Sequence, residues 1–170
     1  IDTEYIAALE MQKALAKRGV EINFNSYLQE HSGTTFTAIF QHYFGDTMSA
    51  DEQYQLMTKV ESQVAQNVKA ISGMPGLINN LAVAKSVVSN SSIATVRQAL
   101  EVTGMTNDFQ GRIFSSEQVK RPKPAPDLYH FAVESIGIDP NEFLVVEDSP
   151  TGVQAAVAAG LEVIGFTGAS

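Results

Sequence analysis

Apolar side chains recur at helical spacing throughout residues 1–72. The first stripe, which Gly19 is placed to end, comprises Tyr5, Ala8, Met11 and Leu15. The second is rich in aromatic rings and comprises Phe36, Ile39, Phe40, Tyr43 and Phe44. The third follows a capping-box pattern at 49–52 and comprises Met57, Val60, Val64, Val68 and Ile71. Such stripes are typical of helices that pack against one another, so this part is predicted to be all-helical.

The pattern changes at Gly73-Met74-Pro75-Gly76, where two glycines and a proline have the composition of a hinge or linker. Beyond this point strand-like apolar runs alternate with helical stripes. The strand-like runs are 86–89, 112–114, 143–147 and 163–166. Alternating strands and helices predict a parallel sheet with right-handed crossovers. We therefore expect an α/β fold with two parts, a helical subdomain over 1–72 and an α/β core over 73–170.

Two adjacent carboxylates, Glu147 and Asp148, follow the apolar run 143–146. That run is predicted to be a strand buried on both faces. Ligands of open α/β sheets gather at the carboxyl ends of the strands, where a pair of acids suggests a divalent metal. The alternative is that Asp148 caps the helix that begins near Pro150. On this segment alone, both interpretations stay open.

Two further segments are predicted to reach the same edge of the sheet. Ser89-Asn90-Ser91-Ser92 lies between a strand and a helix, where hydroxyl and free N–H groups can bind an anion. A serine there could equally be only an N-cap, and both roles can coexist. Lys123 lies between two prolines, which fix its backbone direction and suit it to bridging a phosphate and a carboxylate. The alternative for this second segment is a basic surface loop.

Composition narrows the possible partners. Nineteen acidic residues against eleven basic ones give a net charge of −8, which argues against nucleic acid and anionic membranes as partners. A phosphorylated small molecule remains compatible if a few cations are placed locally. The absence of cysteine excludes disulfides, thiol catalysis and Cys-ligated zinc. With no signal peptide or spanning segment visible, the expected location is the cytoplasm.

Taken together, three segments resemble successive motifs of one family. Ser89 in Val87-Val88-Ser89-Asn90-Ser91, Lys123 in Lys123-Pro124-Ala125-Pro126-Asp127 and Glu147-Asp148-Ser149 are similar to the second, third and fourth motifs of haloacid dehalogenase-like hydrolases. The variety is the one that contains β-phosphoglucomutase and small sugar-phosphate phosphatases. The resemblance implies a Rossmann-like parallel sheet, and it implies that residues 1–72 are the inserted all-helical cap of that group.

The resemblance also implies roles for individual residues. Ser89, helped by the backbone N–H of Asn90, would bind the transferring phosphoryl group. Lys123 would neutralise the charge shared by the phosphate and a nucleophilic carboxylate. Asp148, with Glu147 beside it, would hold Mg²⁺. Phosphoryl transfer needs positioning and charge neutralisation, and this set of residues can supply both.

The family's first motif, Asp-x-Asp-Gly-Thr at the end of the central strand, would come just before Ile1. Its first Asp is the nucleophile that becomes an aspartyl phosphate, and its second Asp is a general acid/base. We expect the intact protein to carry this strand upstream, and further residues beyond Ser170. Asp2 is predicted to be an N-cap of the first helix and not the nucleophile.

The resulting function prediction is a Mg²⁺-dependent phosphatase acting on a small phosphorylated metabolite, a sugar or polyol phosphate, through an aspartyl phosphate. A phosphohexomutase is the alternative, but the expected cap loop, residues 30–35, carries no Arg or Lys to hold a second phosphate. Within that loop His31 is a candidate substrate contact, or an incidental loop histidine. A non-catalytic phosphometabolite-binding protein without the nucleophile is the alternative of another class. A dehalogenase is disfavoured, because that reaction does not need the metal.

Overall fold

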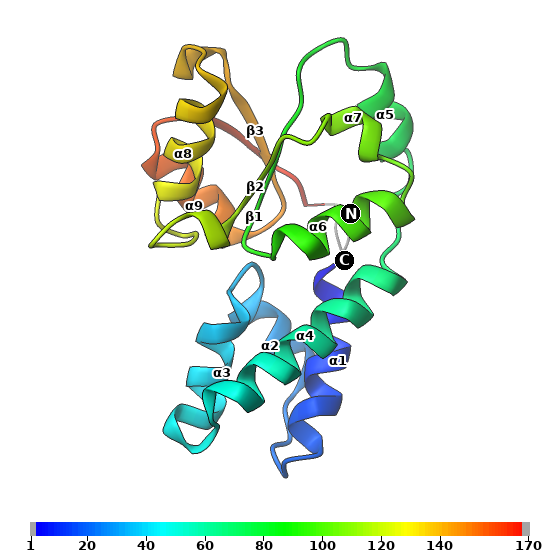
Figure 1. The fold of residues 1–170 in the computed structure, drawn as a ribbon, viewed down its shortest axis with the longest axis vertical. Helices are drawn as coiled ribbons and strands as arrows, with labels where there is room; N and C mark the ends of the chain where they lie inside the picture. The colour runs from blue at the N-terminus through cyan, green and yellow to red at the C-terminus, as the bar shows by residue number, and fades with distance from the viewer. Residues whose placement is uncertain (1–2, 168–170) are drawn as a thin grey trace.

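A computed structural model describes residues 3–167 of the chain, apart from the side chain of Asp46. Figure 1 shows a helical part, here called the cap (residues 3–72), below a strand-containing part, called the core (residues 73–167). The cap elements are α1 Glu4–Ala16, α2 Phe24–His31, α3 Phe36–Phe44, η1 Gly45–Thr47 and α4 Ala50–Asn67. The core helices are α5 Met74–Asn80, α6 Ile93–Val102, α7 Thr106–Phe109, η2 Ser116–Gln118, α8 Asp127–Ile136, η3 Pro140–Glu142 and α9 Pro150–Ala158. The strands are β1 Val87–Ser89, β2 Ile113–Ser115, β3 Leu144–Glu147 and β4 Glu162–Gly165.

The cap is built around one apolar cluster, as its three stripes predict. Its buried members are Ala8, Met11, Leu15, Tyr27, Ile39, Phe40, Val60 and Val64. The predicted capping box is confirmed, because Ser49 and Glu52 bond each other's backbone N–H groups at the start of α4. Tyr5 is the exception in the first stripe: it is half exposed and meets Phe24 edge to face.

Helix α2 has no counterpart in the sequence-based prediction, which treated residues from Glu30 onward only as part of a loop. Its start is marked by Asn23, whose side chain accepts a hydrogen bond from the Ser26 N–H. The observed loop between α2 and α3 is shorter than predicted and covers residues 32–35. His31 is therefore the last residue of a helix.

The core strands pair in parallel, β1 with β2 and β3 with β4. Side chains alternate along β1 and β2, so Val87 and Ile113 pack toward α6 and α7, whereas Val88 and Phe114 pack toward α8. Figure 1 shows this layering, with α5, α6 and α7 on one side of the strands and α8 and α9 on the other. Among residues 3–167, no strand hydrogen bonds join β1 to β3.

The prediction that the run 143–146 is buried on both faces is wrong for the described residues. Val145 packs into the cluster beneath α8 and α9, but Leu144 and Val146 are 55% and 58% exposed. The reason is the same alternation of side chains, since the described helices cover only one face of this strand pair. The exposed apolar face continues onto Ile164 of β4.

The predicted linker at 73–76 is also corrected. Only Gly73 breaks the chain, with a φ of 81° that suits glycine, and Met74, Pro75 and Gly76 form the first turn of α5. Proline is tolerated there because first-turn N–H groups have no partner within the helix. The connection between α4 and α5 therefore runs over residues 68–73, and a boundary between 72 and 73 stays a prediction. None of the described helices is both long and apolar enough to cross a membrane.

Candidate functional site

The three predicted motif segments meet at the carboxyl ends of β1 and β3, and Lys123 joins them. Its ammonium group donates to the backbone carbonyl of Val88 at 3.0 Å and forms an ion pair with Glu147. It also lies 5.5 Å from the centre of the Tyr129 ring. Lys123 is only 7% exposed, so the alternative of a basic surface loop does not hold for this residue.

The Glu147 carboxylate is fully engaged by neighbouring donors. Oε1 accepts from Lys123 and from the Tyr129 hydroxyl at 2.8 Å, and Oε2 accepts from the Ser149 hydroxyl at 3.1 Å. Burial alone would raise the pKa of Glu147, but the charge of Lys123 and these hydrogen bonds outweigh it and hold the pKa below its ordinary value. Gly152 makes room for this arrangement, because a Cβ there would overlap the carboxylate. Glu147 is therefore ionised and holds Lys123 in place.

Asp148 differs from its neighbour. It is exposed, and within residues 3–167 its carboxylate makes no hydrogen bond or ion pair with another side chain. The helix-cap alternative is excluded, since the N-cap of α9 is Ser149, whose hydroxyl accepts from the Gly152 N–H at 3.1 Å. Partial desolvation and the nearby charge of Glu147 raise the pKa of Asp148. A hard, uncompensated carboxylate at a strand end fits a divalent cation such as Mg²⁺.

Ser89 and Asn90 form the turn directly after β1. The Ser89 hydroxyl accepts from the Ser91 N–H at 3.1 Å. Two hydroxyl groups stabilise this turn. Ser115 at the end of β2 donates to the Ser91 carbonyl, and Ser116 at the start of η2 donates to the Asn90 carbonyl, each at 2.7 Å. The Asn90 side chain bonds the backbone of Lys123, so this turn and the Lys123 segment are held together.

The N-terminus of α6 is less open to an anion than the sequence suggests. Ser92 is its N-cap and accepts from the Thr95 N–H at 3.2 Å, as one of the two interpretations of this segment predicts. The Ile93 N–H donates to the Glu117 carboxylate at 2.8 Å. Glu61 of α4 accepts from the Ser92 and Thr95 hydroxyls. Carboxylates of the protein itself therefore occupy this helix terminus, which leaves the turn at Ser89 and Asn90 for a ligand.

The α2–α3 loop of the cap points toward the core in Figure 1, and its Gly33 carbonyl accepts from the Asn90 side chain at 2.9 Å. Gly33 has a φ of 71°, and a Cβ at this position would overlap Ser149 and Thr151. Sequence reasoning missed this contact and also missed Tyr129, whose only signal is its place on the inner face of α8. The structure therefore adds Gly33, Tyr129 and Ser149 to the predicted site residues.

His31 lies within a ring cluster of the cap. Its Nε2 is 3.2 Å from the Tyr43 hydroxyl, and its ring also contacts Tyr27 and His42. Desolvation, and then the charge of His42, lower the pKa of His31. Glu30, His31 and His42 are the one group of three possible metal ligands found among the described residues. A contact between His31 and a substrate stays a prediction.

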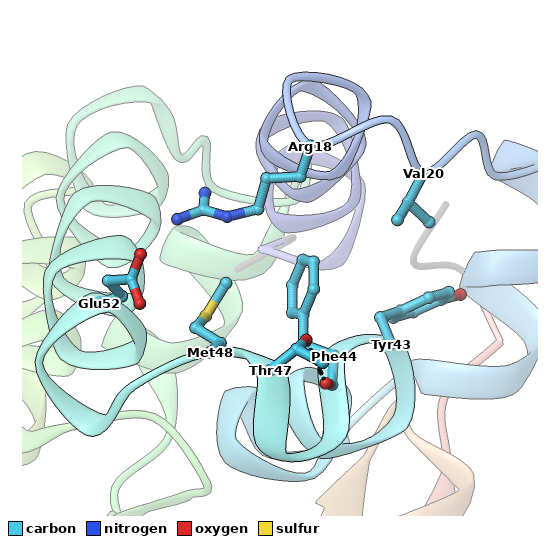
Figure 2. Close-up of a pocket in the computed structure, with 7 residues that line it drawn as sticks. All are labelled: Arg18, Val20, Tyr43, Phe44, Thr47, Met48 and Glu52. Atoms are coloured by element: carbon cyan, nitrogen blue, oxygen red, sulfur yellow. Dashed lines mark hydrogen bonds between the residues drawn. The ribbon is translucent and has the colours of Figure 1, made fainter.

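A hollow in the cap is shown in Figure 2. It is lined by Arg18, Val20, Tyr43, Phe44, Thr47, Met48 and Glu52. The Arg18 guanidinium lies 5.8 Å from the centre of the Phe44 ring, on which it packs. All of these residues belong to the cap, coming from α3, α4 and the segments that follow α1 and α3, and none of them is a motif residue.

Comparison with known proteins agrees with this geometry. The family profile for haloacid dehalogenase-like hydrolases matches residues 1–166. Hexitol phosphatase A of Escherichia coli is 30% identical over 141 residues, which are 79% of this chain and 63% of that protein. The chain thus spans less than two thirds of the length of that curated relative.

Two solved structures share the fold. A hydrolase of this family from Deinococcus radiodurans, determined with bound phosphate and sodium, is 30% identical with a TM-score of 0.70, covering 96% of this chain and 74% of that one. β-Phosphoglucomutase from Clostridium difficile has a TM-score of 0.83 at 17% identity, covering 96% and 78%, and shows the fold alone. The α/β class predicted from the alternating pattern is confirmed, as are the Rossmann-like fold implied by the resemblance and the resemblance itself, carried by Ser89, Lys123 and Glu147-Asp148. The chain belongs to the haloacid dehalogenase-like hydrolase family.

Proposed function

We propose that the full-length protein is a Mg²⁺-dependent phosphatase acting on a small phosphorylated metabolite, a sugar or polyol phosphate. The observation that carries this proposal is the buried Lys123–Glu147 pair, which lies beside an open carboxylate, Asp148, at the carboxyl ends of β1 and β3. A fixed cation next to an uncompensated anion suits a ligand that brings phosphate and metal together. The similarity to hexitol phosphatase A supports a polyol phosphate as substrate.

Each site residue has a defined task in this proposal. The Ser89 hydroxyl and the Asn90 N–H bind the phosphoryl oxygens in the turn after β1. Lys123 neutralises part of the phosphoryl charge, and Glu147 keeps the ammonium group pointing at the strand ends. Asp148 is the carboxylate of this chain that would hold Mg²⁺, and the ion would offset negative charge that develops on the phosphoryl group. Glu147 contributes to the metal through its charge, since its oxygens are engaged by Lys123, Tyr129 and Ser149.

The nucleophile is proposed to come from a segment that precedes Ile1. Two observations support an additional strand between β1 and β3: these strands are not paired with each other among the described residues, and Leu144 and Val146 of β3 are exposed. An Asp at the end of such a strand would lie near Lys123 and Asp148. It would form the aspartyl phosphate, and the second Asp of the motif would act as the general acid/base.

A phosphatase is favoured over a phosphohexomutase. A mutase must also hold the phosphate that is not transferred, and the loop that approaches the site, residues 32–35, has no cationic side chain. A non-catalytic binding protein would keep the Ser89 and Lys123 anion site and lack the upstream Asp. A dehalogenase would have no use for the open Asp148.

The test is a panel of phosphorylated polyols and sugars given to the full-length protein with Mg²⁺. We expect phosphate release from at least one hexitol or hexose phosphate, and loss of that release in the Asp148→Asn variant. Isomerised sugar phosphate without phosphate release would favour the mutase. Binding of inorganic phosphate without any turnover would favour the non-catalytic protein.

A further inference from the structure

One side chain of the core connects the cap to the backbone of Lys123. The Asn90 Nδ2 donates to the Gly33 carbonyl of the cap at 2.9 Å and to the Lys123 carbonyl at 2.9 Å. Its Oδ1 accepts from the Lys123 N–H at 3.0 Å. Both amide hydrogens and the amide oxygen are therefore engaged, and every partner is a backbone group. A side chain held in this way has one well-defined position.

The cap side of this connection is tightly packed. Gly33 has a φ of 71°, and a Cβ there would overlap the side chains of Ser149 and Thr151. Ser149 in turn bonds the Glu147 carboxylate at 3.1 Å, and Glu147 holds the Lys123 ammonium. The loop backbone at Gly33 thus contacts two residues that help to fix Lys123, namely Asn90 and Ser149. Through Asn90 it reaches the Lys123 backbone, and through Ser149 it reaches the carboxylate that orients the side chain.

We propose that Asn90 is a positioning residue that couples closure of the cap to the placement of Lys123; this inference rests on the proposed phosphatase function. When the α2–α3 loop lies on the core, Asn90 closes its last hydrogen bond and fixes the backbone on which Lys123 stands. When the loop lifts away, the amide loses its Gly33 acceptor and the Lys123 segment loses part of its support. The charge that neutralises the phosphoryl group is then fully in place only while the cap excludes water.

A second contact between cap and core gives a matched comparison. Glu61 of α4 accepts hydrogen bonds from Ser92 at 2.9 Å and Thr95 at 3.0 Å. It lies in the second half of α4, and among the described residues neither partner forms a hydrogen bond with Lys123. Loss of the Glu61 contact should loosen α4 against α6 without moving Lys123. Loss of the Asn90 contact should loosen the α2–α3 loop against the core and also displace Lys123.

The first measurement is a distance between cap and core in the full-length protein without substrate. Residues 1–170 contain no cysteine, so spin labels can be placed at Tyr54→Cys on α4 and Val157→Cys on α9, with any cysteine elsewhere replaced. Both positions are more than 60% exposed. We expect Asn90→Ala and Asn90→Asp to lengthen or broaden the distance distribution. Asn141→Ala, an exposed asparagine of η3, is the control and should leave it unchanged.

The second measurement is a kinetic double-mutant cycle. Asn90→Asp and Gly33→Ala should each lower kcat/KM by about tenfold or more. Asn90→Asp removes the amide donor, and the Cβ added at Gly33 displaces the loop that carries the acceptor carbonyl. The double variant should be little worse than the worse single one, because residues that act through one contact are not additive. Paired with Asn90→Asp, Glu61→Gln should give additive losses.

The outcomes separate this inference from the proposed function. A distribution unchanged by both Asn90 variants would overturn the coupling, even if the protein is an active phosphatase. Additive losses from Asn90→Asp and Gly33→Ala would overturn it as well. A protein without phosphatase activity would contradict the proposed function, while the label distances would still report whether Asn90 holds the cap.

Discussion

The cap and the core bury different kinds of side chain. Every buried residue among the described side chains of the cap is apolar, and most of them belong to one cluster that includes Tyr27 and Phe40. The core divides its apolar residues among three smaller clusters. It also buries all five of the polar residues buried within the described part of the chain, namely Thr95, Ser115, Lys123, Glu147 and Ser149.

This difference indicates that the functional groups lie in the core. Burying a charge is costly unless it is paired and hydrogen-bonded, so a buried Lys–Glu pair is weak evidence for stability and better evidence for a function. The cap, by contrast, can be understood as packing alone. It meets the core through backbone at Gly33 and through Glu61, and its apolar cluster serves to hold these contacts in position.

The largest expected effect comes from breaking the charge pair in the core. Lys123→Met leaves Glu147 buried without its cation, which should lower the free energy of unfolding by about 3–5 kcal/mol. Activity should fall about a thousandfold or more, since charge neutralisation at the phosphoryl group is lost. Urea unfolding and steady-state rates measure the two effects, and Lys120→Met, an exposed neighbour, is the control.

The double variant Lys123→Met/Glu147→Gln sharpens this result. It removes the unpaired charge, so it should regain much of the lost stability and none of the activity. If it regained activity as well, Lys123 would have only a structural role.

Next in size is Asp148→Asn, which removes the one exposed carboxylate of the motif. We expect activity to fall about a hundredfold or more and the Mg²⁺ concentration needed for half-maximal rate to rise, because a neutral amide is a poorer Mg²⁺ ligand. The free energy of unfolding should change little, since no other described side chain bonds this carboxylate. An unchanged Mg²⁺ requirement would mean that the metal lies elsewhere.

A change in the cap should have the opposite profile. Phe40 is 1% exposed and lies at the centre of the cap cluster, so Phe40→Ala should cost about 3–5 kcal/mol of stability. The rate of the folded fraction should change far less than in Lys123→Met. Chemical denaturation followed by circular dichroism, together with rates at low temperature, measures both. A full loss of activity in the folded Phe40→Ala protein would contradict the view that the cap cluster contributes packing alone.

The smallest effect is expected from His31→Ala. Its ring packs within the cap against Tyr27, His42 and Tyr43, and the structure gives it no contact with the core residues of the site. We expect kcat/KM to change by less than about fivefold, the range of a single weak contact. A loss of kcat/KM as large as that of Asp148→Asn would instead indicate that His31 binds the substrate directly.

Regular patterns made much of the fold predictable from sequence. Long helices with repeated stripes, such as α1 and α4, were located correctly, and the capping box at Ser49 fixed the start of α4 to the residue. The end of α4 was predicted too late: the stripe continues to Val68 and Ile71, whereas the helix ends at Asn67. Helix α2 was missed because eight residues give too short a stripe. Helix α5 was missed because proline and glycine in a first helical turn look like a linker.

The candidate site was predictable in membership but not in arrangement. Ser89, Lys123 and Glu147-Asp148 follow from local motifs. The different environments of Glu147 and Asp148 could not be predicted from these motifs. They depend on the hydrogen bond from Tyr129 to Glu147 and on Ser149, not Asp148, being the N-cap of α9. The contact between Gly33 and Asn90 joins residues 57 positions apart and leaves no local pattern.

The central claim is that Asp148 and the Lys123–Glu147 pair serve metal-dependent phosphoryl transfer. The most direct test is phosphate release from a hexitol phosphate by the full-length protein, first in excess chelator and then after Mg²⁺ is restored. The account predicts negligible release in chelator, and recovery with Mg²⁺ in the wild-type protein but not in Asp148→Asn. Full activity in chelator, or equal recovery in both proteins, would contradict it.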